Sequence, residues 1–224
     1  MRRFLRENGL GLGFGLIFLA ALIGQALVGH ADFNHQQVAH HDQAVSLGRY
    51  VVSSDFAADV AENWQSEYLQ FSLYIFGTIW LLQRGSPESK KMDRPGRETD
   101  EEQKLREHAT PDSPRWARPG GWRTLLYSNS LLIVMTLIWL GSWGAQAVSG
   151  HVAYDANQFD HQEAAVDFLQ YLGTSDFWNR TLQNWQSEFL AVGSMAVLSI
   201  YLRQRGSPQS KPVGASHDAT GVEG

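Results

Sequence analysis

Two long stretches of this chain contain no charged residue, and they constrain its fold more than any other feature. Asp, Glu, Lys and Arg are absent from residues 8–31 and from residues 124–154. Because an α-helix rises about 1.5 Å per residue, about 20 apolar residues cross a hydrocarbon core roughly 30 Å thick. Each stretch is therefore long enough to cross a membrane, although the mean hydropathy of the whole chain is only −0.27.

Two shorter uncharged runs, residues 68–83 and 189–202, each follow a glutamate. Each becomes long enough to cross a membrane if its helix begins near Trp64 or Trp185, which would place a tryptophan at the membrane–water interface. The alternative interpretation is that these runs are buried helices of a water-soluble domain. We predict four membrane-crossing helices, because the charges that flank the runs follow the pattern of membrane proteins.

The second half of the chain repeats the first half. A shift of 121 residues aligns residues 5–90 with residues 126–211 without a gap, and the motifs NWQSE and QRGSP occur in both halves. A register without gaps over this length indicates a tandem duplication. Each repeat would form a helical hairpin that crosses the membrane twice. Because two is an even number, the repeats would be parallel, related by an axis along the membrane normal.

Positive charge predicts the orientation of the hairpins, since Lys and Arg concentrate on the cytoplasmic side of membrane proteins. Only Arg49 and Arg180 fall on the predicted outer side. Both termini and the connection between the hairpins are therefore predicted to be cytoplasmic. The residues that carry this prediction are Arg2, Arg3, Arg6, Arg84, Lys90, Lys91, Arg203, Arg205 and Lys211.

The first helix of each hairpin is expected to continue beyond the membrane, to about His40 and His161. Polar residues at spacings of four, three and four share one helical face there. The returning helices are expected to begin at Ser54 and Ser175, whose hydroxyls would cap free N–H groups. The polar residues on the shared face are His30, Asn34, Gln37 and His41.

The predicted fold is all-α: an integral membrane four-helix bundle of two parallel tandem hairpin repeats, with helical extracytoplasmic extensions. Residues 1–90 form the first hairpin, residues 91–121 a polar cytoplasmic linker, residues 122–211 the second hairpin, and residues 212–224 a tail whose composition predicts disorder. Lipid supplies no hydrophobic drive between helices, so small residues are expected at close helix contacts. These are Gly24, Gly29, Gly141, Gly144 and Gly150.

Three motifs carry a resemblance to a known family: RRFLRENGL at the start, NWQSE in each hairpin, and LRQRGSPQSK near the end. Through them the whole chain resembles an uncharacterised family of bacterial membrane proteins described only as a domain of unknown function. The resemblance implies a multi-pass protein of the bacterial cytoplasmic (inner) membrane with four spans. It implies no activity, cofactor or catalytic residue.

Polar residues gather where both hairpins are expected to meet the outer interface. Glu67 and Glu188 lie one turn after an interfacial tryptophan, where an ionisable side chain is costly to bury and is often functional. We expect both carboxylates to be partly buried and hydrogen-bonded. The cluster is either an ion, proton or metal site, or a set of hydrogen bonds that only join helices. Its members are Gln25, His30, Asn63, Glu67, Gln146, His151, Asn184 and Glu188.

The histidines offer ligands for Zn²⁺ or haem iron, since His30 and His151 occupy equivalent positions. No short metal-binding spacing recurs in both repeats, however, and Gln162 stands at the position equivalent to His41. The absence of cysteine excludes disulfides, thiolate metal sites and cysteine nucleophiles. We therefore expect no cofactor and leave the identity of any metal open.

Net charge and the absence of known motifs argue against several function classes. A net charge of −5 argues against a partner nucleic acid, and no P-loop, GxSxG or HExxH motif is present. We expect a non-enzymatic binding or structural module, with the lipid bilayer and either itself or another membrane protein as partners. The alternatives are a small oligomeric transporter that moves ions or protons through Glu67 and Glu188, and a His/Glu metal or haem redox protein.

Overall fold

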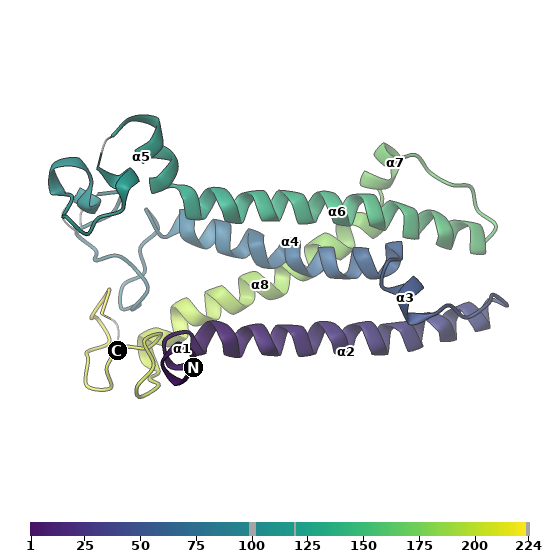
Figure 1. The fold of residues 1–224 in the computed structure, drawn as a ribbon, viewed down its shortest axis with the longest axis horizontal. Coiled ribbons are helices and arrows are strands. Elements are labelled where there is room, and N and C mark those ends of the chain that lie inside the picture. Colours follow the sequence, from purple (N-terminus) through teal and green to yellow (C-terminus); the bar gives the residue numbers. More distant parts are fainter. Residues whose placement is uncertain (99–101, 119, 223–224) are drawn as a thin grey trace. The chain divides into compact units, whose positions relative to one another are not determined.

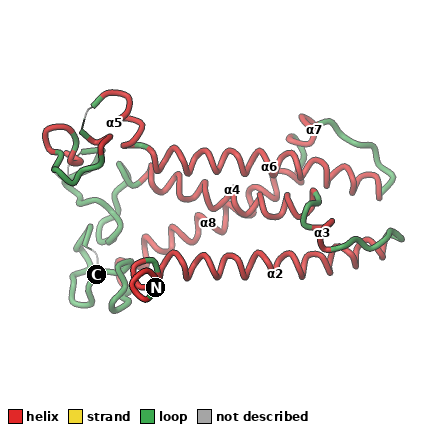
Figure 2. The backbone as a smooth tube through the Cα atoms, in the orientation of Figure 1, coloured by secondary structure: helices red, strands yellow, loops and turns green. Residues whose placement is uncertain are grey.

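The computed structural model describes residues 1–98, 102–118 and 120–222, and the regular structure of these residues is entirely helical (Figure 2). They form eight α-helices and three short 3-10 helices, which confirms the all-α prediction. Residues 99–101 and 119 of the predicted linker, and residues 223–224 of the predicted tail, lie outside the described residues.

The chain forms two compact units. The first comprises Met1–Ala61 and Gly144–Phe177, and the second comprises Glu62–Trp143 and Trp178–Gly224. Each unit takes residues from both halves of the sequence, so neither corresponds to one predicted hairpin. The boundaries predicted near residues 90, 121 and 211 stay predictions.

Most of each uncharged stretch lies in one of the two longest helices, α2 (Gly9–Ala39) and α6 (Ser130–Asp160), each of 31 residues (Figure 1). Such a helix is about 46 Å long, which exceeds a hydrocarbon core of roughly 30 Å. Both helices end next to the predicted residues, His40 and His161. Among the described residues, these are the two helices that are long and apolar enough to cross a membrane.

An asparagine separates each long helix from a short helix that precedes it. The short helices are α1 (Arg2–Glu7), which ends at Asn8, and α5 (Gly121–Ser128), which ends at Asn129. The asparagines have φ values of −120° and −114°, and each side-chain amide donates to the carbonyl four residues earlier. Each bond ties the asparagine side chain to the last turn of the short helix.

The returning helices, α4 (Ser54–Gly77) and α8 (Ser175–Tyr201), begin where the sequence predicts. The capping residue, however, lies one position earlier than predicted. Ser53 and Thr174 accept hydrogen bonds from backbone N–H groups three residues ahead, each at 3.3 Å. The reason is geometric, because a cap precedes the first helical residue and accepts from the second or third N–H of the helix.

Helix α4 ends earlier than the apolar run that it contains. The run continues to Gln83, but the helix stops at Gly77, whereas α8 continues through the equivalent position. The hydroxyl of Thr78 donates to the carbonyls of Tyr74 and Ile75, at 2.8 and 3.3 Å. Glycine is a poor helix former, and a threonine that bonds back to the preceding turn weakens the helix further.

Two short helices of the first unit, α3 (Leu47–Tyr50) and α7 (Phe168–Leu172), each place a buried tyrosine against a long helix. Tyr50 is 3% exposed and Tyr171 is 0% exposed. Their ring centroids lie 5.9 and 5.6 Å from the ring of a histidine on the long helix. Aromatic pairs at such distances add about 0.5–1.5 kcal/mol beyond the burial of their surface.

Each tyrosine hydroxyl lies against a glycine of the long helix. A Cβ on Gly29 would collide with the hydroxyl of Tyr50, and a Cβ on Gly150 would collide with that of Tyr171. These two glycines therefore lie at close helix contacts, as predicted. The prediction is wrong for the other three, where an added Cβ would meet no atom within 4 Å: Gly24, Gly141 and Gly144.

In the second unit the linker forms three 3-10 helices, η1 (Glu102–Lys104), η2 (Arg106–His108) and η3 (Arg115–Ala117). The hydroxyl of the buried Thr124 donates to the carbonyl of Trp116 at 2.7 Å. This hydrogen bond attaches η3 to α5, so the linker is anchored to the helix that leads into α6.

Replacing Gly29 or Gly150 with alanine should destabilise the protein, because the new Cβ would displace a buried tyrosine. Overpacking of this kind costs about 1–3 kcal/mol. Gly24→Ala and Gly144→Ala are matched controls on the same helices, in open space, where alanine is favoured over glycine by up to about 1 kcal/mol. Thermal unfolding in detergent measures the difference. Adding Tyr50→Phe to Gly29→Ala should recover part of the loss, whereas equal stability of all four single variants would contradict the contact.

Candidate functional site

The structure divides the residues of the predicted polar site between its two units. Gln25, His30, Gln146 and His151 belong to the first unit, and Asn63, Glu67, Asn184 and Glu188 belong to the second. In the first set Gln146 is buried and the other three are half-buried. That all eight form one ring stays a prediction, and each set has contacts of its own.

In the first unit, the two predicted histidines hold the loops that follow the long helices. Nε2 of His30 donates to the carbonyl of Val45 at 2.7 Å, and Nε2 of His151 donates to the carbonyl of Val166 at 2.8 Å. A carbonyl oxygen only accepts, so Nε2 of each ring carries a proton in this arrangement and is not free to bind a metal. The described residues contain no group of three or more His, Asp or Glu that could hold a metal ion.

A second polar side chain on each long helix completes the contact with the loop. The N–H of Val45 donates to Oδ1 of Asn34 at 2.7 Å, and the N–H of Val166 donates to Oδ1 of Asp155 at 3.0 Å. The helix thus satisfies both backbone groups of one loop residue, as a part-buried peptide requires. The predicted site omitted both side chains, although the four-residue spacing from the histidine could have indicated them.

Acidic residues surround the hydroxyl of Tyr50. Burial raises the pKa of this hydroxyl above its ordinary value, and the charges of Asp59, Asp55 and Asp32 raise it further. A phenolate would be poorly solvated and would be repelled by these carboxylates. Tyr50 therefore stays protonated at physiological pH and serves as a neutral packing group.

In the second unit, the two repeated glutamates are not buried alike. Glu67 is exposed and Glu188 is half-buried, so the burial predicted for both is wrong for Glu67. The neighbouring Gln65 and Ser66 occupy the buried face of the helix instead. The two carboxylates interact with each other electrostatically. The amide of Asn184, a predicted partner of Glu188, donates to a backbone carbonyl of the preceding turn at 3.0 Å.

Sequence reasoning missed the side chains that join α4 to α8. Gln65 is 0% exposed, and its Oε1 accepts a hydrogen bond from Nε1 of Trp185 at 2.8 Å. Nearby, a guanidinium nitrogen of Arg180 lies 3.2 Å from a carboxylate oxygen of Glu62. Arg180 stands out in the sequence as one of the two arginines on the predicted outer side, but nothing in the sequence points to Glu62 as its partner.

Tryptophans extend this junction from α8 to α6. The ring of Trp143 stacks on that of Trp139 with centroids 5.9 Å apart, and it lies 6.3 Å from the rings of Trp178 and Trp185. Together with Gln65 these residues form the tryptophan–glutamine cluster. Two buried donors of the cluster, Nε2 of Gln65 and Nε1 of Trp139, have no acceptor among the described residues.

The comparison with protein families adds one result. A family model described as "Domain of unknown function (DUF6766)" matches residues 1–222. The chain belongs to this family. Comparison with curated proteins and with solved structures returned no match. The family description assigns no activity, so the chemistry of this DUF6766 chain has to be inferred from its own residues.

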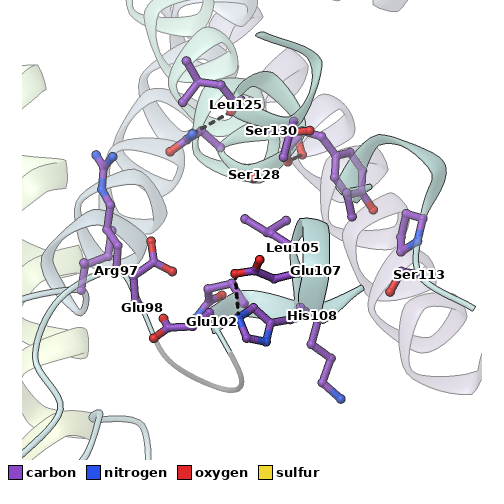
Figure 3. Close-up of a pocket in the computed structure, with 18 of the residues that line it drawn as sticks. Arg97, Glu98, Glu102, Leu105, Glu107, His108, Ser113, Leu125, Ser128 and Ser130 are labelled. Carbon is purple, nitrogen blue, oxygen red and sulfur yellow. Dashed lines mark hydrogen bonds and ion pairs between the residues drawn. The ribbon is translucent and has the colours of Figure 1, made fainter. Parts of the chain in front are cut away.

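The second unit of the DUF6766 chain also holds a cavity of about 1160 Å³ between the linker and the start of α6 (Figure 3). Its lining carries charges of both signs, and one of its carboxylates lies 3.7 Å from a histidine ring nitrogen. Because the lining carries both positive and negative charges, it does not favour a ligand of either charge. We therefore assign no ligand to it. The charged residues that line it are Lys90, Arg97, Glu98, Glu102, Lys104 and Glu107.

Trp185→Phe should destabilise the DUF6766 chain more than Trp64→Phe. The first change leaves the buried Gln65 amide without its donor, and such a loss costs about 1–3 kcal/mol. Trp64 is the equivalent residue of the first half and is 41% exposed, so it serves as the control for the same chemical change. Thermal unfolding in detergent provides the measurement. Gln65→Leu should lower the stability less in the Trp185→Phe background than in the wild type, because the bond is already lost there. If the two changes lower the stability additively, the bond does not contribute.

Proposed function

We propose that this DUF6766 chain is a multi-pass protein of the bacterial cytoplasmic membrane, built from two parallel tandem hairpins that cross the membrane four times. Its termini are cytoplasmic. It acts as a non-enzymatic binding or structural module with a polar cluster near the outer side, and its partners are the lipid bilayer and either itself or another membrane protein.

The uncovered apolar surface of α2 carries the proposal. No residue of this helix is buried, and its apolar side chains are open to their surroundings, as at Leu10 (79% exposed), Leu16 (68%) and Val28 (72%). Burying such a side chain away from water is worth about 1.5–3 kcal/mol. An exposed side chain in water forgoes this gain, whereas a hydrocarbon environment supplies it without any contact within the protein. A helix of this kind is therefore stable in a membrane and not in water.

Helix α6 supports the same interpretation. Only 11% of its most apolar window is buried, whereas the core helix of a water-soluble protein is mostly buried. A signal sequence would also be apolar, but it lies at an N-terminus, and α6 lies in the middle of the chain. Its apolar surface is therefore best explained by contact with lipid.

Contacts that recur 121 residues apart support the duplication and the number of spans. The His–carbonyl bonds, the Tyr–Gly contacts and the Asn helix ends each occur at equivalent positions in both halves. Duplicated helices that cross in the same direction require the chain to recross the membrane between them. Helix α4 is the longest of the helices that lie between α2 and α6 in the sequence, and α8 is its equivalent.

The tryptophan–glutamine cluster supports a binding role. Its two buried donors, Nε2 of Gln65 and Nε1 of Trp139, lack acceptors within the described chain, and leaving a buried donor unsatisfied costs about 1–3 kcal/mol. A hydrogen-bond acceptor supplied by a lipid or a small ligand would remove this cost. Of the histidines, which would be the catalytic candidates, His30 and His151 each use Nε2 to bond a backbone carbonyl.

Cysteine labelling tests the topology, and the absence of native cysteine means that no background has to be removed. Single cysteines at the exposed positions Gln43 and Ala164 should react with an impermeant thiol reagent in intact spheroplasts. Cysteines at Asp112 and Gln209, which are also exposed, should react only after the membrane is permeabilised. The reverse pattern would overturn the orientation, and labelling of all four in intact spheroplasts would overturn the four-span arrangement.

The electrostatic interaction between Glu67 and Glu188 favours a second candidate, an oligomeric carrier of protons or ions. Carboxylates that interact in this way can share a proton or a cation. The bonds from His30 and His151 to backbone carbonyls give no support to the third alternative, a metal or haem redox protein.

Proton flux into proteoliposomes separates the two candidates. We expect no flux above that of protein-free vesicles, since the first candidate moves no ion. Flux that is lost in Glu67→Gln and Glu188→Gln, but kept in Glu163→Gln on an exposed loop, would replace the first candidate with the second.

A further inference from the structure

The RGSPxSK motif forms the same loop twice in the second unit, at residues 83–90 and 204–211. The glycines of the two loops, Gly85 and Gly206, have the same φ of +83°. In both loops the second serine hydroxyl accepts a hydrogen bond from the backbone N–H of the glutamine that begins the loop, at 2.9 Å. The two loops are therefore equivalent in conformation.

Their surroundings differ, because the C-terminal segment covers the glycine of the first loop and leaves the glycine of the second loop open. The N–H of Gly85 donates to Oγ1 of Thr220 at 2.8 Å, and the N–H of Gly221 donates to the carbonyl of Ser86 at 3.0 Å. A Cβ on Gly85 would collide with the carbonyl oxygen of His217. A Cβ on Gly206 would meet no atom within 4 Å.

A buried lysine holds the C-terminal segment in the shape that makes these contacts. Lys211 is 1% exposed, and its ammonium donates to three carbonyls of the segment at 2.8–3.2 Å, those of Ser216, His217 and Ala219. Burial, and then the charge of Arg203, lower the pKa of this ammonium from its ordinary value. Charge-assisted bonds to three carbonyls offset the loss of solvation.

A histidine ties the same segment to the last helix. Nδ1 of His217 donates to the carbonyl of Ile200 at 3.0 Å, and its ring lies 5.5 Å from that of Tyr201. The segment is therefore bonded to the end of α8 on one side and to the first loop on the other. Its composition, by contrast, predicts a disordered tail.

We propose that residues 211–222 form a C-terminal clasp, for which the loop at residues 83–90 is the docking surface. The clasp joins the loop that follows α4 to the end of α8. Its partner is thus a segment of the same chain. The segment is held by one bond from the Gly85 N–H to the Thr220 hydroxyl and one from the Gly221 N–H to the Ser86 carbonyl, and it is oriented by Lys211. The inference does not depend on the proposed function, because all of these contacts lie within one unit.

Hydrogen exchange of the full chain in detergent, followed by mass spectrometry, tests the clasp. Backbone amides of residues 213–222 should exchange at least about tenfold more slowly than in an unstructured peptide, and tenfold corresponds to about 1.4 kcal/mol. Gly85→Ala should remove this protection, because its Cβ occupies the position of the His217 carbonyl. Gly206→Ala carries the same backbone strain in open space and should leave the protection unchanged.

A milder pair of variants keeps the test valid if Gly85→Ala does not fold. Thr220→Val removes the hydroxyl that accepts from the Gly85 N–H and should speed exchange at Gly85, whereas Thr220→Ser keeps the hydroxyl and should not. Unprotected amides at residues 213–222 in the wild type, or equal responses to Gly85→Ala and Gly206→Ala, would overturn the clasp. The tail would then be disordered, as its composition predicts.

Discussion

Hydrocarbon offers no hydrogen-bond partner to a peptide group, so an uncharged segment is stable there only if its own backbone bonds are closed, as they are in a helix. Helices α2 and α6 meet this condition over 31 residues each. Their apolar side chains remain largely uncovered by the rest of the chain, so packing within the protein contributes little to holding them. Their specific contacts are local: both helices bond to the loops that follow them, and α6 also packs its tryptophans against α8.

In the C-terminal parts of α2 and α6, the same set of contacts occurs twice. A histidine and an amide or carboxylate satisfy one loop residue in each half, and a buried tyrosine closes against a glycine. These groups leave water and must find partners within the protein, because an unpaired buried polar group costs more than a formed bond returns. The histidines that the sequence offers as metal ligands are used in this way, as structural donors.

The candidate site shows where sequence reasoning succeeds and where it stops. The repeated NWQSE motif correctly predicts a buried polar side chain in this part of α4. The residue that is buried there, however, is Gln65 and not Glu67. The reason is that the motif states which residues are present and not which face of the helix another helix covers. The same limit applies to the five glycines predicted at close contacts, since only Gly29 and Gly150 among them would place a Cβ against a neighbouring side chain.

The sequence by itself determined the helical class, the ends of the long helices and the starts of the returning helices, because hydrophobic length and local capping depend on residues near one another in the chain. Only the tertiary structure decided which equivalent residues differ. Gln65 and Trp185 pair across the two halves, and Gly85 is covered while Gly206 is open. A duplicated sequence specifies equal local conformations, but each copy has different neighbours, and contacts between distant residues determine the rest.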